Sequence, residues 1–103
     1  MLEAAEAAIA DLRGRSREDL DLAPWLTRSV LQCLQVIGEA ATRVGAETRE
    51  SLPELPWADM VAMRNRLVHA YWDVDLDIVW RTVVEDLPTL VEALGALIGE
   101  EPD

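Results

Sequence analysis

Residues 57–72 have the sequence W-A-D-M-V-A-M-R-N-R-L-V-H-A-Y-W, which includes the only histidine and the only tyrosine of the chain, His69 and Tyr71. At about 100° per residue, most apolar side chains of this segment fall on one stripe of an α-helix. Arg64 falls in the middle of that stripe, whereas Arg66 points to the opposite face. Because an unpaired buried charge is costly, Arg64 is expected either to reach solvent or a carboxylate, or to line a cleft or subunit interface that receives an anion.

Three further amphipathic helices are predicted from the spacing of apolar side chains. Residues 2–13 are rich in alanine and glutamate and are followed by Gly14, a residue typical of helix ends. A long helix is expected over residues 25–44, directly after a proline, which is favoured at helix starts. The last helix covers residues 76–98, and its period continues through Pro88, which predicts one kinked helix or two abutting helices.

The segments between these helices are short and polar. Ser16 precedes two acidic residues and indicates the cap of a short helical piece, and residues 46–56 form a polar connector. Residues 73–77 (D-V-D-L-D) lack the glycine and glutamate spacing of a calcium-binding loop, so they are expected to cap the last helix. No segment alternates with a period of two, so the sequence predicts an all-α fold, an antiparallel bundle of four to five helices.

Length, composition and charge limit the class of protein. The 103 residues suit one domain, taken as residues 1–103, with no membrane-spanning run and no start typical of a signal peptide. The single cysteine, Cys33, excludes an internal disulfide, which agrees with a cytoplasmic location, and it lies on an apolar stripe as a small core residue. The net charge of −11 argues against broad electrostatic binding to nucleic acid, but leaves room for a local basic site or a protein partner.

Arg64 and His69 are the residues that best support a chemical reaction. The chain has no histidine and cysteine spacing typical of a metal site and no glycine-rich phosphate loop, and nothing local supports a Ser–His–Asp triad. A histidine that accepts the 2′-hydroxyl proton and an arginine that neutralises the attacked phosphate suit metal-free cleavage of RNA. On a straight helix, however, the two residues lie roughly 140° apart. Either the helix loosens near His69, or a second copy completes the site across a two-fold axis.

The segment M-R-N-R-L-V-H-A-Y-W-D-V-D, residues 63–75, resembles the HepT-like toxins of the HEPN superfamily. Their hallmark, R-x4-H-x-Y, is found here as Arg64, His69 and Tyr71, and Asn65 follows the arginine as it usually does in those proteins. The resemblance continues in order along nearly the whole chain, at I-G-E-A-A (37–41), L-P-E-L-P-W (52–57), V-W (79–80) and D-L-P (86–88). One departure is the first helix, which begins late and is expected to be shorter than in other members.

This resemblance implies a HEPN-like helical domain that dimerises, with two Arg–His motifs at a shared cleft. It implies a metal-independent endoribonuclease without a cofactor, with tRNA among its substrates, that acts as the toxin of a type VII toxin–antitoxin pair. In that role Arg64 stabilises the phosphate, Asn65 positions it and His69 is the acid/base. The implied partner is an MNT-type nucleotidyltransferase antitoxin that adenylylates Tyr71.

Two other interpretations of the motif remain open from the sequence. The chain fits a catalytically silent helical dimer that binds a nucleotide or a protein partner, which its acidity favours because RNA is repelled. It also fits a structural core in which Arg64 and His69 only satisfy each other or a carboxylate. If a dimer forms, its interface is expected to include the stripe between Trp57 and Tyr71.

Overall fold

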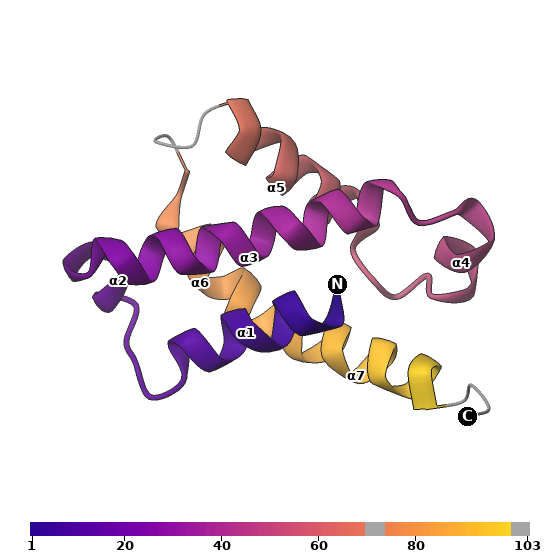
Figure 1. Cartoon of the computed structure of the whole chain (residues 1–103), viewed down its shortest axis with the longest axis horizontal. Helices are drawn as coiled ribbons and strands as arrows, with labels where there is room; N and C mark the ends of the chain where they lie inside the picture. The colour runs from indigo at the N-terminus through magenta and orange to yellow at the C-terminus, as the bar shows by residue number, and fades with distance from the viewer. Residues whose placement is uncertain (70–73, 100–103) are drawn as a thin grey trace.

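The computed structural model describes residues 1–69 and 74–99, and within these ranges it contains helices and no strand (Figure 1). Four long helical units make up the bundle: α1 (Leu2–Leu12), α3 (Pro24–Thr42), α5 (Trp57–His69), and the continuous unit of α6 (Leu76–Arg81), η2 (Thr82–Asp86) and α7 (Leu87–Gly99). Two short helices, α2 (Asp19–Leu22) and α4 (Ala46–Ser51), connect them. The predicted all-α fold is confirmed, although part of the polar connector at 46–56 forms α4.

The ends of the helices follow from local chemistry. Gly14 has a φ of 75°, a left-handed conformation that glycine adopts without strain, and it terminates α1 as predicted. Pro24 is the first residue of α3, where its missing N–H is tolerated. Asp75 caps α6, because its carboxylate accepts a hydrogen bond of 2.9 Å from the Asp77 N–H. The aspartate run therefore caps the last helix at Asp75, as expected.

Helix α3 is the centre of the bundle. It packs against α5 on one side and against α1 on the other, and α1 in turn packs against α7 (Figure 1). Each of the four long helical units supplies an apolar stripe to one buried cluster, whose fully buried members include Ala5, Ala8, Leu26, Val30, Val79 and Leu90. Burial of these apolar side chains stabilises the fold. None of the described helices is both long and apolar enough to cross a lipid bilayer.

The last helical unit contains one turn of π-helix. In η2 the Leu87 N–H donates to the Thr82 carbonyl, five residues back, instead of to the fourth residue as in an α-helix. The next residue, Pro88, has no N–H, and in a regular α-helix its ring collides with the carbonyl four residues earlier. The wider π-turn relieves this conflict, so the helix continues through Pro88, as its apolar period predicted.

Candidate active site

The start of the motif helix α5 is fixed by an indole and a guanidinium. Trp57 is buried, and its Nε1–H donates to the Leu52 carbonyl at 3.0 Å. The guanidinium of Arg49 lies over the indole ring, 5.8 Å from its centroid, and its Nη2 donates to the Ala41 carbonyl at 2.6 Å. These contacts join α4, the end of α3 and the beginning of α5.

The middle of α5 approaches α3 so closely that only glycine fits between them. A Cβ added at Gly38 would lie 2.2 Å from the Cβ of Arg64 and 2.8 Å from the Met60 carbonyl oxygen. Both distances are well below van der Waals contact, so any side chain at this position displaces one helix. Gly38 therefore determines where the backbone of Arg64 lies.

The side chain of Arg64 leaves this crossing toward the solvent and forms an ion pair. Its Nε donates to the Glu39 carboxylate at 2.6 Å, and its Nη1 donates to the Asn65 side-chain oxygen at 2.8 Å. The side chains of Arg64 and Glu39 are 29% and 36% exposed. The carboxylate accounts for an arginine on an apolar stripe, because the charge is paired and only partly desolvated. The two hydrogen bonds also orient the guanidinium.

His69 is the last residue of α5, and its side chain is exposed. The helix stays α-helical through this residue, so it does not loosen between Arg64 and His69. Arg64 points toward Glu39 on α3, and no hydrogen bond joins it to His69. The structure thus brings Arg64 and Asn65 together and leaves His69 apart from them, while Tyr71 lies outside the described residues.

Glu39 is a site residue that the sequence analysis missed. It lies within the I-G-E-A-A block that was noted for its resemblance, yet nothing in the local sequence assigns the carboxylate to Arg64, 25 residues later. The available signal was the adjacency of Gly38 and Glu39. A glycine inside a long helix suggests a close helix contact, and an acidic residue beside it is a candidate partner for a charge on the opposing helix.

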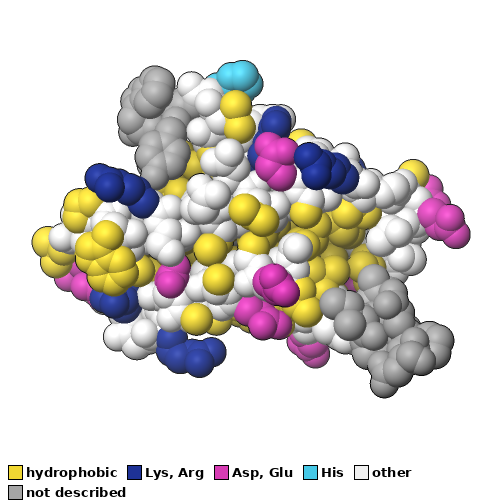
Figure 2. Space-filling view, viewed as in Figure 1, with side chains coloured by type: hydrophobic (Ala, Val, Ile, Leu, Met, Phe, Trp, Pro, Cys, Tyr) yellow, Lys and Arg dark blue, Asp and Glu magenta, His cyan; other side chains and the backbone are white. Residues whose placement is uncertain are grey.

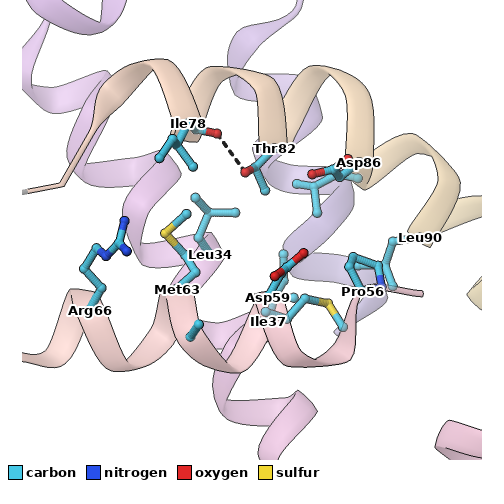
Figure 3. Close-up of a pocket in the computed structure, with 13 residues that line it drawn as sticks. Leu34, Ile37, Pro56, Asp59, Met63, Arg66, Ile78, Thr82, Asp86 and Leu90 are labelled. Carbon is cyan, nitrogen blue, oxygen red and sulfur yellow. Dashed lines mark hydrogen bonds between the residues drawn. The ribbon is translucent and has the colours of Figure 1, made fainter. Parts of the chain in front are cut away.

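The opposite face of α5 borders a cavity of about 270 Å³ (Figure 3). Its floor is apolar, with Leu34 and Met63 between the two ends of the cavity. Arg66 lies at one end, and near the other end the carboxylates of Asp59 and Asp86 extend from facing helices. Burial raises the pKa of Asp86, and the negative charges of Glu85 and Asp59 raise it further, against the opposing effect of Arg81. The full lining also includes Ile37, Pro56, Met60, Ala62, Ile78, Thr82, Leu87 and Leu90.

The described side chains offer little other reactive chemistry. Across residues 1–69 and 74–99, no three histidine, cysteine, aspartate or glutamate side chains gather as a metal site requires. Cys33 is half-buried on α3, and burial raises the pKa of its thiol, with a further contribution from the charge of Asp11. A thiol with a raised pKa is a poor nucleophile at neutral pH, which agrees with the packing role expected for Cys33.

Comparison with known proteins gives a consistent result. A family model described as "Ribonuclease HepT-like" matches residues 1–97. A candidate RNase of Caldanaerobacter subterraneus subsp. tengcongensis is 33% identical over 101 residues, which cover 98% of this chain and 90% of that protein. A candidate ribonuclease HepT of Thermococcus cleftensis is 42% identical over 62 residues, which cover 60% of this chain and 56% of that protein. No solved structure gives a significant match. The chain belongs to the HepT-like ribonuclease family, as the R-x4-H-x-Y motif indicated.

Proposed function

We propose that this protein is a metal-independent endoribonuclease that acts as the toxin of a type VII toxin–antitoxin pair in the cytoplasm. The observation that carries the proposal is the position of Arg64, the arginine of the family motif. Its guanidinium is held at the surface by Glu39 and Asn65, and the helix that carries Arg64 ends at the exposed His69. This arrangement offers an oriented cation and an accessible imidazole, the two groups that cleavage of a phosphodiester without metal requires.

In the proposed reaction His69 accepts the proton of a ribose 2′-hydroxyl. The 2′-oxygen then attacks the adjacent phosphorus, the bond to the 5′-oxygen breaks, and the leaving oxygen takes up a proton. The products are a 2′,3′-cyclic phosphate and a 5′-hydroxyl. Arg64 neutralises the charge that develops on the phosphate oxygens, Asn65 positions the phosphate through its amide, and Glu39 holds the guanidinium in place.

The proposed site is shared between two copies of the chain. Helix α5 directs Arg64 toward α3 and carries His69 five residues later, so one copy does not present both groups to one phosphate. A two-fold axis beside α5 would bring the motifs of both copies to one cleft. The substrate class is RNA, with tRNA as the favoured example.

A cleavage assay tests the chemistry directly. Wild-type protein is expected to cut tRNA in the presence of EDTA and to leave 2′,3′-cyclic phosphate ends. His69→Ala and Arg64→Ala should each lower kcat/KM by about 100-fold or more, the usual scale for an acid/base or an oxyanion partner. Products with 3′-hydroxyl ends, or activity that depends on added metal, would contradict the mechanism.

A mixture of the two variants tests the shared site. If Arg64 of one copy acts with His69 of the other, a heterodimer of Arg64→Ala and His69→Ala chains retains one intact site. Mixing the two inactive homodimers is then expected to restore ribonuclease activity. If both groups act from the same copy, every site in the mixture lacks one of them and no activity returns. A monomer in sedimentation experiments would also rule out the shared site.

Control of the toxin is proposed to act on Tyr71. Adenylylation by a partner nucleotidyltransferase adds a bulky group and a negative phosphate two residues beyond His69. The bulky group blocks RNA binding sterically, and the phosphate repels the RNA backbone. Coexpression with the partner is expected to raise the mass of the Tyr71 peptide by one or more AMP units, and Tyr71→Phe is expected to escape control. An unmodified Tyr71 peptide, or a fully neutralised Tyr71→Phe protein, would refute this part of the proposal.

A catalytically silent helical dimer that binds a nucleotide or a partner is the second candidate. The net charge of −11 and the neutralisation of Arg64 by Glu39 both favour it. The comparison of wild type with His69→Ala decides between the two, because a silent dimer gives equal and negligible cleavage in both.

A further inference from the structure

The positive charge of this acidic protein is unevenly distributed. The chain has 20 acidic residues against nine arginines, yet residues 13–28 contain four of those arginines against three carboxylates. This segment joins α1 to α3 and includes α2. Figure 2 shows dark-blue side chains around a yellow patch at the left end of the molecule, where Figure 1 places α2 and the start of α3. RNA that approaches a protein of charge −11 is steered to such a region.

The same segment contains the two most exposed large apolar side chains of the described chain. Trp25 is 60% exposed and Leu22 is 77% exposed. The guanidinium of Arg15 lies over the indole of Trp25, 5.0 Å from the ring centroid, and Arg28 follows one turn later on the same side of α3. We refer to Arg15, Trp25 and Arg28 as the tryptophan platform.

Two arginines of the tryptophan platform have no carboxylate partner among the described residues. Within residues 1–69 and 74–99 the ion pairs involve Arg17, with Asp21 and Asp77, and Arg64, with Glu39, so no carboxylate there balances the charge of Arg15 or Arg28. In the described part of the chain, Arg15 donates to the backbone carbonyl of Asp11 and to no side chain. An exposed aromatic ring beside unpaired guanidinium groups is the combination with which proteins hold single-stranded nucleic acid, because bases stack on the ring and phosphates pair with the cations.

The tryptophan platform also lies toward the end of the molecule at which the motif helix terminates. Helix α5 runs back toward the α2 end of the molecule and rises away from α3, so that its last turn ends above the middle of α3 in Figure 1. The Arg17–Asp77 bond of 2.6 Å further ties the segment that carries Arg15 to the start of α6, which follows α5 in the chain. An RNA strand bound at His69 reaches Trp25 if it extends toward the α2 end of the molecule.

We infer that the tryptophan platform is an accessory RNA-binding surface that stacks an unpaired base of the substrate on Trp25, next to Arg15 and Arg28. This inference rests on the proposed ribonuclease function and adds a substrate feature to it, an unpaired nucleotide outside the cleaved bond. A patch made only of Leu22 and Trp25 would fit an apolar partner protein equally well. The guanidinium groups of Arg15 and Arg28, the first of them stacked on the ring, favour RNA as the partner because RNA is a polyanion.

Binding is measured with a fluorescein-labelled 12-nucleotide single-stranded RNA and the His69→Ala protein, so that no cleavage interferes. Trp25→Ala is expected to weaken binding about 10-fold, whereas Trp25→Phe, which keeps an aromatic face, retains most of the affinity. Arg15→Ala and Arg28→Ala should weaken binding several-fold and each lower the slope of log Kd against log salt by about 0.7. Arg43→Ala, which removes an exposed arginine at the far end of α3, is the matched control and should have a smaller effect than either.

The outcomes separate this inference from the proposed function. If wild type cleaves RNA and Trp25→Ala has an unchanged KM and an unchanged RNA affinity, the tryptophan platform is refuted while the ribonuclease stands. A second outcome is that wild type shows no cleavage, while the His69→Ala protein binds RNA in a manner that depends on Trp25. The tryptophan platform is then supported as an RNA-binding surface, and the ribonuclease function is refuted. A change in oligomeric state on Trp25→Ala, with RNA affinity unchanged, would assign the patch to a protein contact and overturn the inference. Circular dichroism of each variant checks that the exposed substitutions leave the fold intact.

Discussion

The two faces of α5 differ in how they meet the rest of the bundle. Toward α3 the contact is so close that a single Cβ at Gly38 does not fit, and the one charge on that face, Arg64, is paired. Toward η2 and α7 there is a cavity of about 270 Å³ in which Asp59, Asp86 and Arg66 form no ion pair within 4.0 Å among the described residues. Beyond its first residue, which Arg49 of α4 and the Leu52 carbonyl hold, the helix that carries the motif is therefore positioned mainly by α3.

The largest effect is expected from Gly38→Ala. The new Cβ meets the Cβ of Arg64 and the Met60 carbonyl, so α5 must move away from α3. We expect the free energy of unfolding to fall by about 3 kcal/mol or more, at the upper end of overpacking effects, with loss of ribonuclease activity. The control is Gly95→Ala, where a Cβ meets nothing within 4 Å and should stabilise α7 by about 0.5–1 kcal/mol. Equal urea midpoints for the two variants would contradict the close contact.

A second test compares two neighbouring positions of α5, one in the core and one beside the cavity. Leu67 is 3% exposed in the core, whereas Met63 is half-buried and borders the cavity. Leu67→Ala is expected to cost about 3 kcal/mol of unfolding free energy and Met63→Ala about 1 kcal/mol, because a methionine beside an existing void has fewer contacts to lose. Chemical denaturation measures both, and a larger cost for Met63→Ala would contradict the looser packing beside the cavity.

Glu39→Gln addresses the pairing on the close face. The amide still accepts a hydrogen bond from Arg64 but no longer balances its charge, so the guanidinium is held less firmly. We expect kcat to fall about 10-fold, with less than about 1 kcal/mol of lost stability because the pair is partly exposed. Glu39→Ala, which has no acceptor, should lose more activity than Glu39→Gln. Glu47→Gln, an exposed substitution on α4, serves as the control and should leave kcat unchanged.

The smallest effect concerns the cavity face. Burial and neighbouring carboxylates raise the pKa of Asp86 above its ordinary value of 3.8, so the folded state favours the protonated form. The stability that this group contributes is fully present below pH 3.8 and is lost as the pH rises through the higher pKa of the folded state. Asp86→Asn should therefore stabilise the protein at pH 7 by a few tenths of a kcal/mol, as is usual for exposed sites. The gain should shrink toward pH 4, and a destabilised Asp86→Asn protein at pH 7 would contradict this.

The same comparison shows how far sequence reasoning reaches. Periodicity and capping located the helices and the end of α1 at Gly14, because these features depend on neighbours in the chain. Helix geometry also anticipated that Arg64 and His69 diverge. The partnership of Arg64 with Glu39 and the cavity beside Asp86 depend on how α3, α5 and η2 are placed in space, and no local pattern encodes that placement. The sequence places Gly38 within a predicted helix, but only the structure shows that α5 contacts α3 at this glycine.

The π-turn before Pro88 has a consequence for insertions and deletions in this chain. Each hydrogen bond of a π-turn spans one residue more than a bond of an α-helix, so η2 amounts to a helix that carries one additional residue. Removal of one exposed residue, Val84 or Glu85, together with Pro88→Ala to avoid the proline ring conflict, would return the turn to α-helical spacing. The flanking core residues Val79 and Leu90 would then keep their positions against α1 and α3. Thr82–Asp86 is thus the place in this helix where one residue can be removed, once Pro88 is replaced, while the bundle on either side keeps its register.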